Sequence, residues 1–466
     1  MKHWKKLLFP ALFLCLPVFA ACQKKPHDKK AFPTAPIIPG TVAPIDSGAS
    51  PSPAPTPKLG LPTPKPARAA VAEIPDEQNA AANLLAPFAK KGTLEKSGTW
   101  LGLTWEFYND AGSRVCYISG TQNKSLFETV KDDYGSYEAL RENYKEGSPY
   151  ENKPWDTTGV PYKMVIENGT VFTDAKGLFA RYSGYFPDYD LSEVIVGNIR
   201  ITERCAEMFE EQQNLRIPGR IYTAGVTDMS FMFYGCENLT SLDLSGFDTS
   251  SCTNMLGMFW YCHNLGDLDF STFQTSQVTN MSCMFDFCSS LKSLDLSTFD
   301  TSAVTDFSGM FDNCTQLESL TLANFDTSAA QDFSFMFNEC RKLKSLETGY
   351  FRTPQATDMS FLFTNCASLS ELDTGNFDTA CVANMYRMFA GCKEIVTLDL
   401  RHFKTSATTS MREMFAGCEK LFTLNLTSFT IESLTDMRDM FRECNIGRFL
   451  CTSEDIKDNY AARRKK

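Results

Sequence analysis

Residues 226–250 read VTDMSFMFYGCENLTSLDLSGFDTS, and closely related stretches follow this one down the chain. The cysteine of this stretch is followed by another cysteine every 26 residues, with no insertion between copies. The nine cysteines of this ladder are Cys236, Cys262, Cys288, Cys314, Cys340, Cys366, Cys392, Cys418 and Cys444. Repeats of one constant length predict a solenoid, in which each residue type recurs at one height on a stacked coil.

The first half of each repeat carries a helical pattern. Its apolar residues lie at positions i, i+3, i+4 and i+7, which predicts one face of a short helix. In the first copy they are Met229, Met232, Phe233 and Cys236. The residue just before them is Asp, Asn or Ser in every copy, and such side chains cap the free amides of a first helical turn. We therefore expect a short helix in each coil.

The second half of the repeat carries a strand pattern. Leu242 and Leu244 alternate with polar residues, which is the period of two that a strand requires. Together with Leu239 they form the L-x-x-L-x-L core of a leucine-rich repeat. The expected fold class is an α/β solenoid: a right-handed leucine-rich-repeat coil with 26-residue repeats, a parallel β-sheet on one face and short helices on the other.

The unit resembles the cysteine-containing, BspA-type leucine-rich repeats of bacterial surface proteins. The matching stretches are Met-Ser-Phe-Met-Phe-Tyr-Gly-Cys (229–236), Leu-Asp-Leu-Ser (242–245) and Phe-Asp-Thr-Ser (247–250). The resemblance covers residues 226–444, about half of the chain. It implies a lipoprotein of the cell envelope that works through interaction, commonly as an adhesin, and it says more about the fold than about the ligand.

Upstream of the regular copies the sequence matches the repeat pattern less well, as expected for terminal coils that lack one neighbour. Residues 205–215 read as a unit shortened by two residues, with Gln212 in the cysteine position. Residues 171–179 read as another, with Tyr182 in that position. The expected segments are degenerate capping repeats over 165–225, leucine-rich repeats over 226–450 and a C-terminal tail over 451–466.

Residues 73–164 differ from the repeats in composition and are rich in Trp, Tyr and Gly. The runs 104–108 and 115–118, joined by the turn residues 109–112, predict a β-hairpin. We expect a small β-rich cap in front of the repeats. A separate ligand-binding or enzymatic domain is the alternative.

Residues 1–21 predict a lipoprotein signal peptide. A basic start is followed by the apolar run 7–19 and by small residues before Cys22, the order of a bacterial signal peptide. The site resembles a lipobox, which implies lipidation of Cys22. The apolar run is shorter than the roughly 20 residues of a transmembrane helix. Because Phe19 stands where leucine is usual, ordinary cleavage near Ala21 with Cys22 unmodified is the alternative.

Residues 22–72 predict a disordered linker, since twelve prolines lie between Pro26 and Pro66. Such a segment favours extended polyproline II and acts as a spacer. Residues 1–72 contain ten Lys/Arg and two Asp/Glu, which leaves 35 basic and 54 acidic residues for 73–466. An acidic body argues against nucleic-acid binding, which needs a basic face.

One column between the strand leucines is acidic in six of eight copies, and a leucine-rich repeat exposes this column on its sheet face. The six residues are Asp243, Asp269, Asp295, Glu347, Asp373 and Asp399. Like charges this close should raise one another's pKa values, bind cations or meet a basic partner. We expect the protein to need no cofactor. Calcium is the one ion that the carboxylates of this column could bind. The alternative is that the acids only keep the surface solvated.

The cysteine ladder is expected to be a structural set of free thiols. Each cysteine falls on the inward side of the coil, where a small apolar group packs well. Cys444 and Cys451 are the best candidates for a disulfide, since exported cysteines are usually bonded. No histidine lies in register with the ladder, so we expect no metal.

Catalysis finds little support, and we expect the protein not to be an enzyme. Neither His263 nor His402 stands in a recognisable nucleophile setting, and no P-loop or H-E-x-x-H is present. The expected function is protein–protein interaction or adhesion to host or neighbouring cells. The expected partners are host matrix or cell-surface proteins and, through the lipid, a membrane.

The expected location is the bacterial cell envelope, surface-exposed and lipid-anchored, on the outer membrane if the cell has two. Two other functions stay open. A glycan- or nutrient-capturing lipoprotein would use the aromatic residues around Trp100, Trp105 and Trp155, and a third possibility is a purely structural envelope component.

Overall fold

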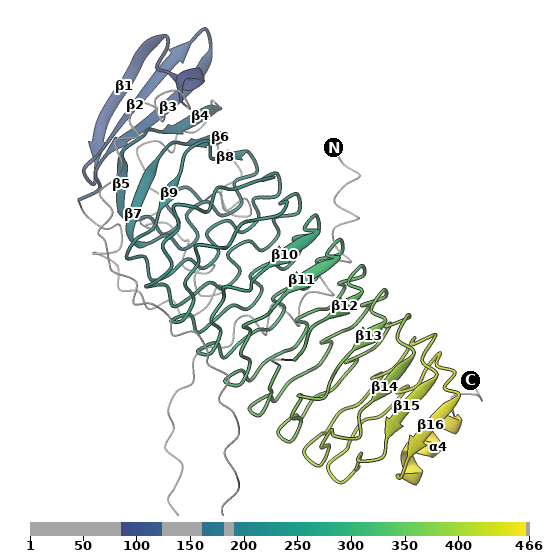
Figure 1. Ribbon diagram of the computed structural model, residues 1–466. Coiled ribbons are helices and arrows are strands. Elements are labelled where there is room, and N and C mark those ends of the chain that lie inside the picture. Colours follow the sequence, from purple (N-terminus) through teal and green to yellow (C-terminus); the bar gives the residue numbers. More distant parts are fainter. Residues whose placement is uncertain (1–84, 124–160, 181–190, 350, 463–466) are drawn as a thin grey trace, which may run out of the picture.

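The chain folds into an elongated solenoid whose coils stack from the N-terminal strands to a C-terminal helix (Figure 1). The computed structural model describes residues 85–123, 161–180, 191–349 and 351–462. The expected signal peptide, Cys22, the linker, Tyr182 and Trp155 lie outside these residues. Within them, no helix is long and apolar enough to cross a membrane.

Short parallel strands form the expected sheet of the repeats. Their bounds are β10 (Ser293–Asp295), β11 (Ser319–Thr321), β12 (Ser345–Leu346), β13 (Glu371–Leu372), β14 (Thr397–Asp399), β15 (Thr423–Leu426) and β16 (Arg448–Cys451). Leu294 lies opposite Leu320, and Leu398 opposite Leu424. Each pair is one repeat apart, so the paired strands keep one register. The strands form three separate short sheets, and the coils at 239–245 and 265–271 have no strand. The parallel sheet predicted from the leucine alternation is confirmed.

An antiparallel hairpin begins the solenoid, as the sequence predicts. A short 3₁₀ turn, η2 (Ala86–Phe88), comes first and is followed by β1 (Thr93–Trp100), β2 (Leu103–Asp110) and β3 (Ser113–Gly120). Strand β2 pairs in antiparallel fashion with β1 on one side and with β3 on the other. Ala111 and Gly112 form the β2–β3 turn with φ values of 50° and 93°. Two positive φ values are what a tight two-residue hairpin turn needs.

The hairpin sheet continues directly into the coils. Strand β3 pairs in parallel with β4 (Tyr162–Ile166), which pairs with β6 (Leu191–Val196) and then β8 (Leu215–Arg216). A second parallel sheet holds β5 (Thr170–Asp174), β7 (Ile199–Arg204) and β9 (Ile221–Tyr222). The cap therefore covers the first coil by sharing its sheet.

The short helices expected in every coil do not form. Within the described residues the only α-helix is α4 (Glu454–Ala462), beyond the last repeat. In the repeats, residues 229–236 and their equivalents form a series of tight turns. The N–H groups of Phe231 and Phe233 donate to carbonyl oxygens of the next coil, at 2.8 and 3.0 Å. Those of Tyr234 and Cys236 donate three residues back, at 3.0 and 3.1 Å.

Left-handed backbone explains why these turns are not a helix. Two positions of each repeat, those of Phe231 and Gly235, have φ values of 56° and 68° in the first copy. The equivalent residues in all nine copies have positive φ as well. A helix needs negative φ throughout, so these residues interrupt it, and the N–H groups of Phe231 and Gly235 themselves donate to carbonyl oxygens of the next coil at 2.8 Å. We call residues 229–236 and their equivalents the turn ribbon.

The predicted capping residues do accept amide hydrogen bonds, although they cap the turn ribbon and not a helix. Asp228 Oδ1 accepts the N–H of Ser230 at 3.0 Å, and Asn280 Oδ1 accepts that of Ser282 at 2.9 Å. Each bond spans two residues, the geometry by which Asx side chains close a turn.

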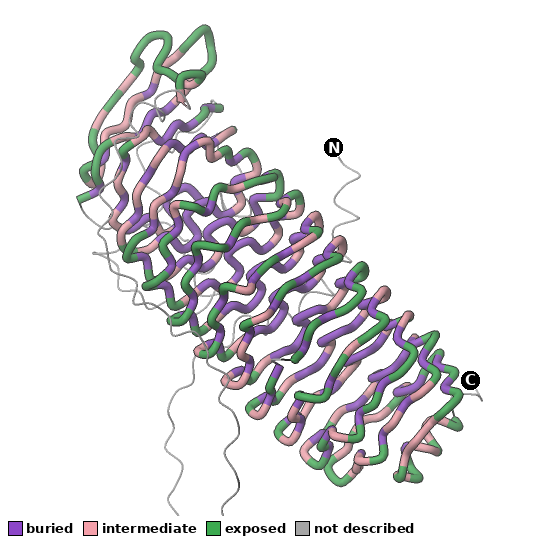
Figure 2. Tube along the Cα trace, in the orientation of Figure 1, coloured by how far each residue is buried: buried purple, intermediate pink, exposed green. Residues whose placement is uncertain are grey.

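Columns of identical side chains fill the core, and buried residues recur in every coil (Figure 2). Eleven phenylalanines form one stack with neighbouring ring centroids 5.5–6.0 Å apart. They are Phe179, Phe209, Phe233, Phe259, Phe285, Phe311, Phe337, Phe363, Phe389, Phe415 and Phe441. Offset stacking at this distance adds to the gain from burial.

The cysteine ladder runs beside this stack and is hydrogen-bonded to it. Cys262 donates its thiol hydrogen to the carbonyl oxygen of Phe233, one coil back, at a sulfur–oxygen distance of 3.1 Å. Cys288 and Cys314 bond Phe259 and Phe285 in the same way, at 3.1 and 3.2 Å. Gln212, predicted to replace a cysteine, likewise donates to a backbone carbonyl of the preceding coil at 2.5 Å.

The stack predicts a large cost for removing one ring. Phe311 is fully buried, with ring neighbours at 5.8 and 5.5 Å. Phe311→Ala should lower the free energy of unfolding by about 3–5 kcal/mol, measured by urea unfolding, because it leaves a cavity between two rings. Phe422, which is 58% exposed, is the control, and its alanine variant should change stability by no more than about 0.5 kcal/mol. Equal effects of the two variants would contradict the stacked core.

Candidate functional site

The acidic column lies where it was predicted, on the exposed side of the sheet. Asp295 ends strand β10 and Asp399 ends strand β14, and all six acids are exposed. Leu294 and Leu398, the preceding residues, point into the core. The alternation along the chain therefore places the column on the outside, where six of its eight residues are acids and the other two are Thr321 and Asn425.

The predicted rise in the pKa values of this column is wrong for the three acids whose pKa is shifted. Hydrogen bonds from Ser271 lower the pKa of Asp269, and hydrogen bonds from Ser297 lower that of Asp295. For Asp243, burial raises the pKa, but hydrogen bonds from Ser245 and Arg220 outweigh it and the pKa is lowered. Ser245, Ser271 and Ser297, each two residues after its acid, thus favour the charged form of these three carboxylates.

The calcium hypothesis gains no support from the arrangement. Among the residues that the structure describes, no group of three or more His, Cys, Asp or Glu lies close enough to hold a metal ion. Two acids of the column have a basic neighbour instead, since Asp243 pairs with Arg220 at 3.1 Å and Asp399 with Arg401 at 3.2 Å. Arginine therefore already meets this column within the chain.

The ladder cysteines are buried free thiols, as expected. Burial raises the pKa of each thiol for which a shift is resolved, and that of Cys392 reaches about 12. The structure forms no disulfide between Cys444 and Cys451, so the disulfide suggested for this pair is wrong. A raised pKa keeps a thiol protonated and therefore able to donate to the phenylalanine carbonyl and slow to react.

The outer side of the turn ribbon is a surface that the helical interpretation missed. Its two left-handed positions carry glycine in some coils, such as Gly257 and Gly391, and large side chains in others, such as Phe361 and Arg387. A left-handed backbone costs residues other than glycine about 1 kcal/mol. The signal was present in the sequence, because glycine at a fixed position of the repeat is unfavourable in a helix.

Aromatic residues gather on this side of the first coils. Tyr261 stacks on Phe287 with ring centroids 4.5 Å apart, and Trp260 contacts the ring of Tyr234 at 5.3 Å. These rings form a small cluster separate from the main core. Further along, Phe335 stacks on Phe361 at 4.2 Å.

Buried acids lie beside these rings. Asp286 and Asp312 occupy neighbouring coils and are almost fully buried. Burial raises the pKa of both carboxyls. Asp312 accepts hydrogen bonds from Asn313 and Asn338, at 2.8 and 2.7 Å. These groups serve as an internal polar network of the ribbon.

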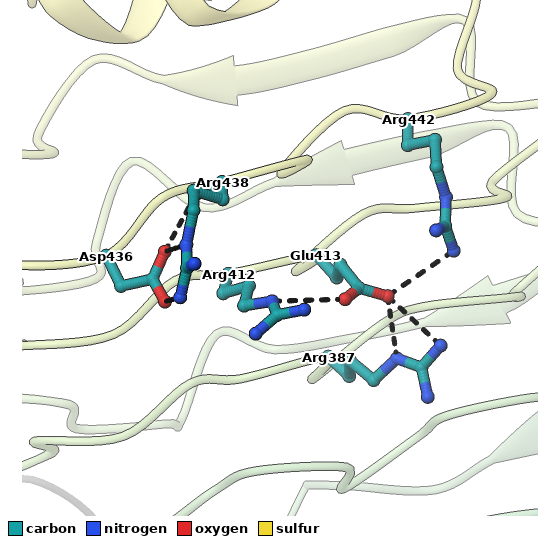
Figure 3. A network of polar contacts seen from close by, with 6 residues as sticks. All are labelled: Arg387, Arg412, Glu413, Asp436, Arg438 and Arg442. Carbon is teal, nitrogen blue, oxygen red and sulfur yellow. Dashed lines mark hydrogen bonds and ion pairs between the residues drawn. The ribbon is translucent and has the colours of Figure 1, made fainter.

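The last coils carry an arginine cluster (Figure 3). Glu413 is buried, and its carboxylate oxygens contact Arg387 at 3.0 Å, Arg412 at 3.2 Å and Arg442 at 3.3 Å. Two guanidinium groups lie near the ring of Tyr386, with Arg387 and Arg412 at 5.9 and 5.6 Å from its centroid. This is a cation–π arrangement.

A neighbouring pair is charge-balanced. Arg438 donates from Nε and Nη2 to Asp436 at 2.9 and 2.7 Å (Figure 3). These hydrogen bonds hold the pKa of Asp436 at about 2. The pair therefore contributes no net charge beside the cluster.

The residues considered for sugar capture and catalysis have structural contacts. Trp100 and Trp105 are partly buried and pack against the main core. His402 Nε2 lies 2.6 Å from the carbonyl oxygen of Thr374, and the ring of His263 packs edge-on against Tyr261 and Phe287.

Comparison with known proteins identifies the repeats. The family described as "Mycoplasma protein of unknown function, DUF285" matches residues 176–270, 202–296, 266–371 and 344–448. No curated protein matches the chain. One solved structure, described as a crystal structure of a TLR13–ssRNA13 complex, is similar over 61% of this chain and 46% of its own, at 16% identity and a TM-score of 0.18. The chain thus spans less than half the length of that protein.

Buried thiols predict slow alkylation in the folded protein. At pH 8, iodoacetamide should modify the exposed Cys381 and leave the nine ladder thiols intact until the chain is unfolded in urea. Because the folded-state pKa is raised, the thiols' contribution to stability is complete below the unfolded-state pKa of roughly 8.5. That contribution should fall as the pH rises from there toward about 12, the folded value for Cys392. Mass spectrometry of labelled peptides checks the first point, and rapid labelling of the ladder in native protein would refute it.

Proposed function

Because this chain belongs to the DUF285 family of repeat proteins, whose matches span residues 176–448, we propose that it is a lipid-anchored cell-surface protein. In this proposal the solenoid binds host matrix proteins or proteins of neighbouring cells. A repeat solenoid is an extended scaffold for protein–protein interaction.

The exposed acidic column of the sheet carries the proposal. It places a carboxylate in six of eight coils on a surface that the coils hold in fixed register. Hydrogen bonds from Ser271 and Ser297 keep Asp269 and Asp295 ionised. An array of fixed negative charges favours a partner with a basic surface, chiefly through faster association and specificity. The pairing of Asp243 with Arg220 is an internal example of the same contact.

The proposed anchor rests on the N-terminal sequence alone. The order of basic, apolar and small residues before Cys22 supports export and lipidation. The proline-rich residues 22–72 would then hold the solenoid away from the membrane. An anchor and spacer of this kind would hold the protein in the cell envelope and expose the acidic column to partners.

The acidic column can be tested with matched aspartates. The double variant Asp269→Asn with Asp295→Asn should weaken binding of a captured matrix protein at least fivefold at low salt and less at high salt, because exposed charges are screened. Binding is measured by surface plasmon resonance on the partner that an immobilised ectodomain captures.

Asp248 and Asp300 are the control pair. Each is exposed and accepts the N–H of a serine two residues on, at 3.0 and 3.1 Å, as Asp269 and Asp295 do at 2.9 Å. They lie outside the strand column. An equal loss in both double variants would contradict a site on the sheet face.

If Cys22 carries the lipid anchor, its replacement should change the location of the protein. Cys22→Ser should abolish incorporation of radiolabelled palmitate in expressing bacterial cells and release the protein from the membrane fraction. Wild-type protein that partitions into the aqueous phase of a detergent extraction would contradict lipidation.

A further inference from the structure

We propose that the outer side of the turn ribbon is a second binding surface, which takes a protein segment with a carboxylate next to an apolar side chain. The surface consists of Phe361, Tyr386 and the arginines around Glu413, and the buried ring of Phe335 packs against Phe361. It goes beyond the proposed function, because it lies on a different side of the coil from the acidic column.

The backbone of these coils is the first argument. Phe335, Phe361, Arg387 and Glu413 occupy the same left-handed position in four successive coils, with φ values of 60°, 59°, 56° and 53°. Gly257 and Gly309 occupy it in earlier coils, so the solenoid forms without a side chain there. Large residues in a conformation that favours glycine point to a role other than folding.

The contacts between these side chains are the second argument. Phe335 stacks on Phe361 at 4.2 Å, and Phe361 meets the ring of Tyr386 edge-on at 4.8 Å. Arg387 lies over Phe361 at 5.8 Å and pairs with Glu413 at 3.0 Å. The rings of Phe361 and Tyr386 and the three guanidinium groups therefore form one continuous platform across four coils.

The charge of the platform is the third argument. Three guanidinium groups surround one carboxylate, and the side chains of Arg387, Arg412 and Arg442 are 32%, 40% and 48% exposed. Contacts with Glu413 use only part of the five N–H donors of each arginine. Stacking and the ion pairs hold the guanidinium groups in place, and fixed guanidinium groups bind carboxylates well.

The surroundings favour a protein segment over a polyanion. Residues 73–466 hold 54 acidic and 35 basic residues, and Glu443, beside Arg442, is 72% exposed. A long sulfated or phosphate chain would extend beyond the small positive platform and be repelled by the negative surface around it. A single carboxylate with an apolar neighbour matches the arginines and the adjoining rings.

The test uses the full-length protein and a fluorescein-labelled decapeptide with two glutamates, each flanked by leucine. Fluorescence anisotropy should show binding, and the same peptide with glutamine should bind at least tenfold more weakly. Arg412→Gln and Arg442→Gln should each weaken binding about tenfold. Phe361→Gly should weaken it about fivefold with no loss of stability in urea, since glycine suits the left-handed backbone.

Arg401 is the matched control. It lies on the sheet face and pairs with Asp399 at 3.2 Å, the same distance that joins Arg412 to Glu413. Arg401→Gln should leave peptide binding unchanged, as should the Asp269→Asn, Asp295→Asn double variant. The second result separates this surface from the acidic column, so either proposal can fail alone.

Three results would overturn the proposal: equal binding of the glutamate and glutamine peptides, unchanged binding in both Arg412→Gln and Arg442→Gln, or tighter binding of heparin than of the peptide. The last result would assign the arginines to a sulfated polysaccharide.

Discussion

In each coil, one carbonyl oxygen fixes the position of the cysteine ladder relative to the phenylalanine stack, in addition to the backbone hydrogen bonds that join neighbouring coils. The carbonyl of Phe233 accepts the N–H of Cys236 in its own coil and the thiol hydrogen of Cys262 in the next, both at 3.1 Å. The same contact recurs along the ladder, for example between Cys392 and Phe363 at 3.1 Å. It requires each phenylalanine ring and each thiol to return to one position in every coil. A repeat of constant length follows, because an added residue would carry the thiol past its acceptor.

This arrangement separates the residues that build the fold from those that are free to vary. Core columns such as Phe233 and Cys236 are uniform, and the strands hold one register. The sheet-face column and the outer side of the turn ribbon lie outside the main core cluster, so their side chains differ from coil to coil while the fold is kept. The two surfaces differ in chemistry, since one presents ionised carboxylates and the other presents rings and guanidinium groups. A solenoid of this kind can therefore hold two partners on separate sides.

The sequence predicted the solenoid, the parallel strands, the hairpin and the buried free thiols, because each follows from a local pattern. The spacing of Cys236 and Cys262 specified the coil length, and the alternation of Leu242 and Leu244 specified the strand. The sequence-based prediction of a helix failed for the turn ribbon. A chain of tight turns buries residues i, i+3, i+4 and i+7 just as a helix does. The deciding hydrogen bonds run between coils, and no local pattern encodes them, although glycine at positions 257 and 309 argued against a helix.

The prediction of raised pKa values for Asp269 and Asp295 was wrong, because the serine two residues after each aspartate donates a hydrogen bond to its carboxylate. The arginine cluster joins Arg387, Arg412 and Arg442 from three coils, and no motif in the sequence marks it.

The claim that constant coil length holds the structure together is tested most directly by deletion within the ladder. Removal of residues 289–314 takes out one complete repeat and joins Cys288 to Thr315, in register. Removal of 289–313 leaves one extra residue at the same junction. The measurement is the urea midpoint of unfolding for the two deletions. The account predicts that the first protein unfolds cooperatively near the wild-type midpoint and that the second unfolds at a much lower urea concentration. Equal midpoints for the two deletions would contradict it.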